Sequence, residues 1–287
     1  MDIALITCAA LPGLHADDRH LLHALAGRGV AVEPVVWEDP YQDWSVPRLC
    51  VIRSAWDYAY RRPAFTAWAD RAAAATRLWN SRAMVHWNTH KRYLCDLAER
   101  GVPVVPTVVV PAGTEASLER LRAERGWGDL VIKAAVAQSG RYIKRVLADA
   151  LDDGRRHLAR YLPHEDMLVQ PFLPAVAQGG ELSAVFVEGE FAHAVRKTPA
   201  GTDFRVHDDY GGAVVRAHPT AAELESAHAA IRAVGEATLY ARVDLVADGD
   251  GRPVVMELEL VEPELFLRFA PETVDRLAEA IVRRLEK

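Results

Sequence analysis

The sequence predicts a mixed α/β and α+β protein, with an N-terminal parallel-sheet lobe followed by antiparallel hairpins and helices. Near the N-terminus, strand-like and helix-like segments alternate, which indicates parallel strands joined by helical crossovers. Further along, alternating apolar runs flank Glu188-Gly189 and the turn at 248–251, as is typical of hairpins. Half of the 287 residues are hydrophobic, which is enough for a sizeable core.

The first lobe is expected to contain three strands and a helix. The strands are "IALITCA" (3–9), "VAVEPVVWE" (30–38) and "RLCVIRSA" (48–55). The helix spans 15–29, with Leu21 and Leu25 on one side and glycines at its end. No glycine fingerprint follows the first strand, so a dinucleotide-binding lobe lacks its phosphate loop.

The remaining segments alternate between helical and extended patterns. Helices are expected over 62–76, 88–101, 117–126, 150–162, 220–238 and 271–286. Extended segments are expected at 102–110, 129–146 (strand, loop, strand), 166–174, 181–197 and 241–260. Asn88 or Thr89 is the expected N-cap of the helix that Gly101 ends.

Charge and composition exclude several classes of protein. The net charge of -6 argues against a general nucleic-acid partner, since there is no basic excess to meet phosphates. No apolar run approaches the roughly 20 residues of a membrane helix, and Asp2 stands where a signal peptide is basic. Three widely spaced cysteines favour a reducing, cytoplasmic location over a disulfide framework.

The stretch "VVMELELVEPE" (254–264) places glutamates in an apolar strand. Glu257 and Glu259 are two residues apart and therefore point to the same face. If Ala247 pairs with Val254 across the turn, Asp244 lies opposite Glu257. Like charges facing each other are destabilising unless a cation lies among them, and hard oxygen ligands suit Mg²⁺.

An alternative interpretation of this strand stays open. The glutamates could face solvent while Met256, Leu258 and Leu260 form the buried face. A register shifted by one residue would separate Asp244 from the glutamates.

Two lysines and a hinge-like segment precede the carboxylates. Lys133 ends the strand "DLVIK" before the small-residue loop "AAVAQSG", and Lys91 lies on the preceding predicted helix. Either lysine could reach phosphate oxygens as a point charge. The segment "LVQPFLP" ends a strand with apolar residues that could face a planar base.

The order of these features resembles the ATP-grasp superfamily, and in particular its glutathione-synthetase-like branch. The segments "WEDPYQDWS", "IRSAWDY", "HKRYLCDLAERGVPVVPT", "HAVRK", "RVDLV" and "MELELVEPEL" resemble the cycloserine synthetase type, the O-ureidoserine cyclo-ligases. The resemblance covers nearly the whole chain. The sequence departs from the superfamily in its lid, which has one glycine, Gly140, in "AAVAQSGRY".

The resemblance implies an ATP-grasp fold and a role for each matched residue. The fold would consist of an N-terminal α/β domain (1–85), a central lobe with the lid (86–172) and a C-terminal lobe (173–287), the last two clasping ATP. The implied ATP-binding residues are Lys91, Lys133, the hinge Gln170, Pro171, Phe172 and Leu173, and Glu181. The implied Mg²⁺ ligands are Asp244, Glu257 and Glu259, and Arg205 and Lys197 would act on an acyl phosphate with Gly211 and Gly212 beside them.

A substrate-reading loop is expected after the third strand, because ligands bind at the carboxyl ends of strands in open α/β sheets. Its residues are Arg53, Ser54, Trp56 and Asp57. The alternative is that Trp56 and Tyr58 are core aromatics and that Asp57 caps a helix.

The predicted function is an ATP- and Mg²⁺-dependent ligase that activates a small amino-acid-like carboxylate as an acyl phosphate for attack by an amine-type nucleophile. That nucleophile could belong to the same molecule, as in a cyclo-ligase. The alternatives are an intermolecular amino-acid or peptide ligase and a nucleotide-binding protein without catalysis. The expected partners are a small-molecule substrate and, by analogy with the superfamily, a second copy of the chain.

Overall fold

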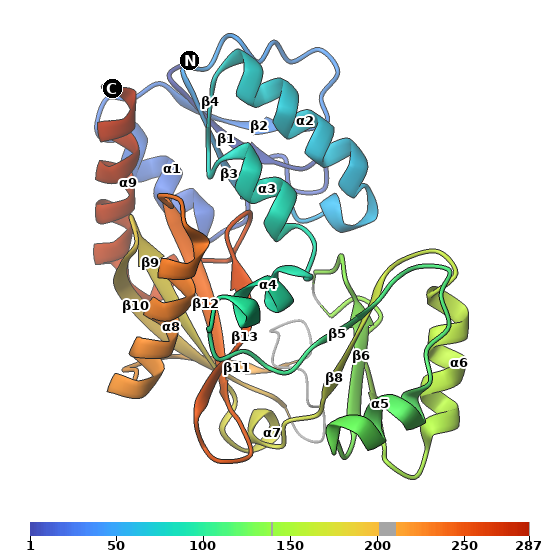
Figure 1. Cartoon of the computed structure of the whole chain (residues 1–287). Helices are drawn as coiled ribbons and strands as arrows, with labels where there is room; N and C mark the ends of the chain where they lie inside the picture. The colour runs from blue at the N-terminus through green and yellow to red at the C-terminus, as the bar shows by residue number, and fades with distance from the viewer. Residues whose placement is uncertain (139, 201–210, 287) are drawn as a thin grey trace.

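A computed structural model describes residues 1–138, 140–200 and 211–286, arranged around three sheets (Figure 1). The first sheet has the order β2-β1-β3-β4 and is parallel throughout, as predicted. Its strands are β1 (Ile3–Thr7), β2 (Val32–Val36), β3 (Leu49–Ser54) and β4 (Arg77–Trp79), and its helices are α1 (Asp18–Ala26), η1 (Tyr58–Tyr60) and α2 (Arg62–Ala75). Strands β1 and β3 are buried at every position, because helices cover both faces.

The second sheet forms a lobe that stands to one side of the molecule (Figure 1). Its order is β5-β8-β6-β7 and its pairs are antiparallel. The strands are β5 (Val108–Val110), β6 (Leu130–Ala134), β7 (Lys144–Val146) and β8 (Met167–Pro171), with helices α5 (Leu118–Arg125) and α6 (Leu151–Tyr161). We call these residues, 108–171, the central lobe. Its core contains side chains from this range alone.

The third sheet is antiparallel, with the order β11-β10-β9-β12-β13. Its strands are β9 (Glu181–Val187), β10 (Glu190–Thr198), β11 (Ala213–Ala217), β12 (Tyr240–Ala247) and β13 (Pro253–Glu259), and its nearby helices are α7 (Ala175–Gly179), α8 (Ala221–Val234), η3 (Leu267–Phe269) and α9 (Pro271–Leu285). Both predicted hairpins are present. Glu188 and Gly189 have positive φ, which matches the twist of a tight hairpin turn. The short strand β11 was not predicted.

The first and third sheets share one hydrophobic core. Leu5 of β1, Val185 of β9 and Ile281 of α9 belong to the same buried cluster. Figure 1 shows α9 beside α1, so the end of the chain packs against its beginning. These elements form one continuous body, from which the central lobe projects.

Of the helix predicted over 88–101, the structure contains α4 (Tyr93–Glu99); α3 (Arg82–Asn88) ends at the first residue of that range, and a turn separates the two helices. The predicted N-cap role of Asn88 and Thr89 is wrong: Ser81 caps α3, and Asn88 ends it. Asn88 instead bonds the backbone of Leu258 and Leu260. Helix α4 packs in the core of the third sheet, while the turn before it also contacts the central lobe, where Lys91 N donates to the Ala135 carbonyl at 2.7 Å and His90 pairs with Asp166 at 3.2 Å. The domain boundaries at 85 and 172 stay predictions.

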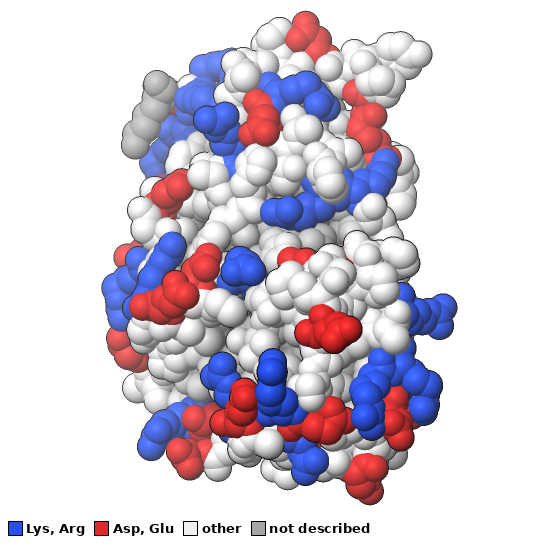
Figure 2. All heavy atoms as spheres, turned by 45° about the vertical axis from the view of Figure 1, so that its right-hand side comes forward, with Lys and Arg blue, Asp and Glu red and all other residues white. Residues whose placement is uncertain are grey.

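The surface mixes charges of both signs. On the face shown in Figure 2, basic and acidic side chains lie beside one another. Within the described residues, no helix is both long and apolar enough to cross a bilayer.

Candidate active site

A cavity of about 550 Å³ lies where the body meets the central lobe. This volume is within the usual range of small-molecule sites. Most of the residues predicted from the sequence line it: Trp56, Lys91, Lys133, Gln170, Pro171, Phe172, Leu173, Glu181, Lys197, Asp244, Glu257 and Glu259. Side chains separated by up to about 200 residues in sequence therefore converge on one space.

The β12–β13 pairing places Asp244 opposite Glu257, as predicted. The predicted pairing at the turn is wrong, since Ala247 lies opposite Pro253 and Val246 opposite Val254. Between the turn and the carboxylates, Met256 forms a bulge and has no partner on β12. This extra residue shifts the pairing by one and restores the expected register at Asp244 and Glu257.

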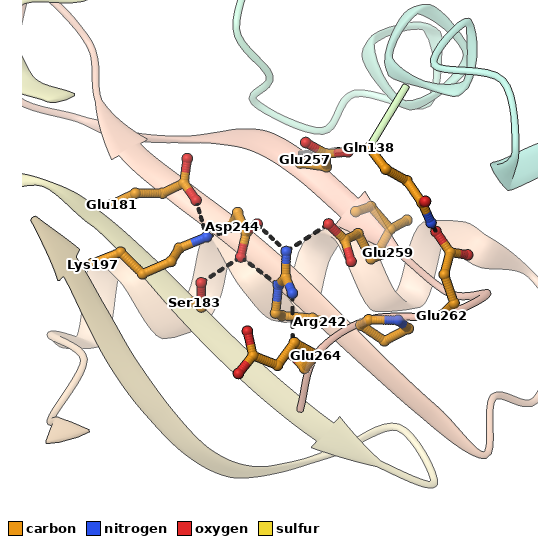
Figure 3. A network of polar contacts seen from close by, with 12 residues as sticks. Gln138, Glu181, Ser183, Lys197, Arg242, Asp244, Glu257, Glu259, Glu262 and Glu264 are labelled. Carbon is orange, nitrogen blue, oxygen red and sulfur yellow. Dashed lines mark hydrogen bonds and ion pairs between the residues drawn. The ribbon is translucent and has the colours of Figure 1, made fainter. Parts of the chain in front are cut away.

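Asp244 is the centre of a buried polar network (Figure 3). Its Oδ1 accepts hydrogen bonds from Ser183 Oγ at 2.6 Å and Arg242 Nε at 2.9 Å. Its Oδ2 accepts from Arg242 at 2.9 Å and Lys197 Nζ at 3.3 Å. Burial opposes ionisation, but Arg242 and Lys197 hold the pKa of Asp244 well below its usual value. The carboxylate is therefore ionised and fixed in place.

Arg242 also reaches the strand opposite. Its guanidinium donates to Glu259 at 2.5 Å, while Lys197 forms a second ion pair with Glu181. The sequence reasoning missed Arg242, although the "RVD" pattern places it two residues before Asp244 and so on the same face. The Arg242 guanidinium lines the cavity and contacts Asp244 on β12 and Glu259 on β13.

The two predicted phosphate lysines lie close to each other at the cavity. Lys91 lies in the turn between α3 and α4, not on a helix, and forms an ion pair with Glu257. Lys133 is on β6, and burial, together with the charge of Lys91, lowers its pKa to about 7. Within the described ranges, Lys133 forms no salt bridge. An anionic ligand would supply its missing partner.

The hinge residues border an apolar part of the cavity. Leu173 packs with Val105, Val176 and Met256. Gln170 is buried and donates to Thr107 Oγ1 at 2.8 Å, and the guanidinium of Arg145 lies 3.8 Å from the centroid of the Phe172 ring. Such apolar walls with few polar groups suit a planar base.

Glu262 is a further carboxylate on the cavity wall. Gln138 of the lid loop donates to it at 2.6 Å. Burial and the nearby charge of Glu259 raise its pKa to about 8. The sequence reasoning left Glu262 without a role.

Three of the four residues predicted to read the substrate lie outside the cavity lining. Arg53 is fully buried, where it donates to Asp18 at 2.9 Å and to the Pro263 carbonyl at 2.6 Å. Ser54 also donates to Asp18, and Asp57 accepts from the Trp37 indole at 2.9 Å. Trp56 lines the cavity, as does Tyr58.

Three predicted residues near 205–212 are absent from the described cavity. Arg205 lies outside the described residues. Gly211 and Gly212 are described but are not among the lining residues. Their expected role beside an acyl phosphate stays a prediction.

The donor set fits Mg²⁺ in its usual mode, in which one or two carboxylates and substrate phosphates share the ion. Glu257 and Glu259 offer hard oxygen atoms on one wall. Across the part of the chain that the structure describes, no three His, Cys, Asp or Glu side chains are arranged to hold a metal by themselves. Coordination by Asp244 would require Arg242 or Lys197 to release an oxygen.

The sheets and the cavity between them define an ATP-grasp fold. Two solved structures share it: a RimK-domain ATP-grasp protein from Sphaerobacter thermophilus (TM-score 0.71, 23% identity, 99% of this chain and 98% of that chain), and the ATP-grasp ligase PsnB complexed with a minimal precursor, Mg and ADP (TM-score 0.66, 18% identity, 99% and 98%). The second sheet is therefore part of the ATP-grasp fold.

Sequence similarity identifies the family. Residues 3–80 match the family model described as the N-terminal domain of the D-cycloserine synthetase DcsG. The cycloserine biosynthesis protein DcsG of Streptomyces lavendulae is 34% identical over 298 residues, covering 99% of each chain. The crystal structure of D-cycloserine synthetase DcsG has a TM-score of 0.91 and 33% identity, covering 99% of this chain and 100% of that one. The chain belongs to the DcsG family of ATP-grasp enzymes, and it is an ATP-dependent carboxylate–amine ligase.

Proposed function

We propose that the chain is a cyclo-ligase that activates the carboxylate of an O-ureidoserine-like amino acid and closes a ring of the cycloserine type. The observation that supports this most is the convergence of Lys91, Lys133, Lys197 and Arg242 on one cavity with the carboxylates of β12 and β13. Such a site suits a polyphosphate and a second, smaller anion. Similarity to DcsG over 99% of the chain supports the substrate class.

The chemistry begins with a poor electrophile. A carboxylate resists attack because its oxygen is a bad leaving group. Transfer of the γ-phosphoryl group forms a C–O–P linkage and releases ADP. A nitrogen of the same molecule then attacks the carbonyl carbon, loses its proton, and displaces phosphate. The protein contributes position and charge compensation.

Each wall would contribute a different part of this reaction. Lys91 and Lys133 would bind ATP phosphates, and Gln170–Leu173 would border the adenine while Glu181 accepts from the ribose. Arg242 and Lys197 would face the reacting carboxyl group, whose carbonyl oxygen becomes negative when the nitrogen attacks the acyl phosphate. Arg205, Gly211 and Gly212 stay assigned to the same step by resemblance.

Magnesium would be held by Glu257 and Glu259, with Asp244 in the same patch. When bound there, the ion would neutralise charge on the transferred phosphate. This role is consistent with the PsnB structure that contains Mg and ADP. The location of the protein in the cytoplasm and its pairing with a second copy are also proposals.

Isotope transfer tests the reaction. With oxygen-18 in the substrate carboxylate, an acyl phosphate requires that label appear in the released phosphate. Unlabelled phosphate would contradict the proposal. Substrate-independent ATP hydrolysis is measured in parallel as the control.

Product mass separates ring closure from intermolecular ligation. O-ureidoserine alone with ATP should give a cyclic product, and an added amino acid should not enter it. A product whose mass includes the added amino acid would support the intermolecular alternative.

A further inference from the structure

The acidic side chains that line the cavity differ in their partners. Six of the seven form an ion pair with a basic side chain: Asp17 and Glu264 with Arg268, Glu181 with Lys197, Asp244 and Glu259 with Arg242, and Glu257 with Lys91. Among these seven described cavity-lining acids, Glu262 is the one without a salt bridge. Its contacts are neutral: the amide of Gln138 and the hydroxyl of Tyr58.

A buried carboxylate is costly unless a cation accompanies it. Glu262 is only 7% exposed, yet it lies on the wall of a cavity. A ligand's positive charge in the space that it faces would therefore lower the free energy of the complex.

The backbone around Glu262 is held in place by side chains from distant segments. The Glu262 carbonyl accepts from the Trp56 indole at 2.9 Å. The carbonyls before and after it accept from Tyr240 Oη at 2.9 Å and from Arg53 at 2.6 Å. The residues once expected to read the substrate thus fix the segment that carries Glu262. A carboxylate with this support is pre-organised for binding.

Two aromatic rings complete the surroundings. Trp56 and Tyr58 line the cavity and also contact Glu262 through hydrogen bonds. An ammonium group is attracted both to a carboxylate and to the faces of aromatic rings. The charges of Glu259 and Lys91 act on Glu262, so it lies beside the site where a carboxylate would be activated. An α-amino acid carries its ammonium and carboxylate on one carbon. Its ammonium could therefore lie at Glu262 while its carboxylate lies at the neighbouring activation site.

We propose that Glu262 binds the α-ammonium group of the substrate. The inference rests on the proposed function and deepens it, because it selects α-amino acids over simple carboxylic acids. Held by Glu262, the α-nitrogen stays protonated and cannot act as a nucleophile, which leaves the distal nitrogen of the substrate to attack.

The test compares two acids and two enzymes. The acids are O-ureidoserine and its deaminated counterpart, 3-(ureidooxy)propionate, and the readout is kcat/KM for ATP-dependent phosphate release. The wild-type chain should prefer the amino acid by about 30-fold or more, since losing one partner of a buried charge pair has effects of this size. In Glu262→Gln this preference should fall to nearly 1.

Glu264→Gln is the matched control, because Glu264 lines the same cavity but is paired with Arg268. It should retain the preference for the amino acid. A purely structural role of Glu262 would lower kcat/KM for both acids equally and would contradict the inference.

The remaining outcomes are also decisive. A variant with an unchanged KM for the amino acid, a low kcat and a shifted pH profile would assign Glu262 to proton transfer instead. Equal use of both acids by the wild-type chain would overturn the inference alone. Absence of release with either acid would overturn the proposed function and the inference with it.

Discussion

The two walls of the cavity, one from the third sheet and one from the central lobe, differ in how their buried charges are paired. On the wall formed by the third sheet, Arg242, Lys197 and Asp244 neutralise one another through hydrogen bonds of 2.9–3.3 Å. On the central lobe, Lys133 is buried and has no salt bridge within the described ranges, and its pKa falls to about 7. On the first wall, these three charges are already paired without a ligand. On the second wall, the proposed phosphate ligand would compensate the charge of Lys133.

Under the proposed function, this difference indicates that the two walls have different roles in binding and catalysis. Groups that must be oriented for phosphoryl transfer benefit from fixed positions, because reorganisation would cost activation energy. A cation that binds phosphate benefits from being poorly compensated, because the anion then gains more from the contact. The separate core of the central lobe allows the second wall to differ without disturbing the first.

The largest effect is expected from removing the central carboxylate. Asp244→Ala leaves Arg242 and Lys197 with one carboxylate partner each, and should lower the free energy of unfolding by about 3 kcal/mol. Denaturant unfolding without nucleotide measures it. Asp250→Ala, on the exposed turn of the same hairpin, should change stability by about 0.5 kcal/mol or less. Similar losses in both variants would refute the contrast between the walls.

Arg242→Met should act on turnover. If the guanidinium stabilises the negative charge that develops on the carbonyl oxygen during nucleophilic attack, kcat should fall by about 10²–10³-fold, with little change in KM for ATP. Phosphate release at saturating substrates measures this, and Arg252→Met, on the exposed turn, is the control. Retention of kcat would remove Arg242 from the reacting centre.

On the lobe wall, Lys133→Met should have opposite effects on stability and binding. Loss of an uncompensated buried cation should raise the free energy of unfolding at pH 7 by up to about 4 kcal/mol, while ATP binding weakens. Lys144→Met, a more exposed lysine on β7, should change neither by much. A destabilised Lys133→Met chain that binds ATP normally would show that this lysine has a structural role.

The smallest expected effect is proton uptake when ATP binds. The pKa of Lys133 is about 7 in the folded chain against 10.5 ordinarily, so at pH 8 the folded protein holds this lysine mostly neutral. ATP phosphates favour the charged form, so binding should take up at most about one proton, more at pH 8 than at pH 6. Calorimetry in two buffers of different ionisation enthalpy measures it. Lys133→Met should reduce the uptake.

The lowered pKa of Lys133 also determines how the stability of the ligand-free protein depends on pH. Between pH 7 and 10.5 the unfolded chain binds a proton at Lys133 that the folded chain does not. This contribution therefore makes the folded state more stable as pH rises through that interval. Below pH 7 both states are protonated and the full cost of burial is present.

Local patterns predicted the parallel sheet, both hairpins and most helices, because these depend on nearby residues. The Asp244–Glu257 pair was predicted for a partly wrong reason, since the turn is one residue out of register and the bulge compensates. Glu257 and Glu259 were found because period-two alternation needs no tertiary information.

Long-range partners explain what the sequence could not give. Arg53 was expected to face a ligand, but Asp18 and the Pro263 carbonyl bury it. Asn88 was predicted to be a helix cap, but its side-chain amide donates a hydrogen bond to the Leu258 carbonyl on β13, 170 residues away in sequence. Glu262 had no distinguishing pattern, because what sets it apart from the other described acids of the cavity is that it forms no salt bridge, which depends on tertiary structure.

The bulge at Met256 also has a consequence for how this hairpin can change over generations. Because it absorbs one residue between the turn and the carboxylates, the register of the turn is separated from that of the site. Insertions or deletions at Asp248–Gly251 can be accommodated locally, while Asp244 and Glu257 stay opposite each other. We therefore expect the tip of the hairpin to accept loop variation or a reporter tag more readily than the nearby carboxylates would.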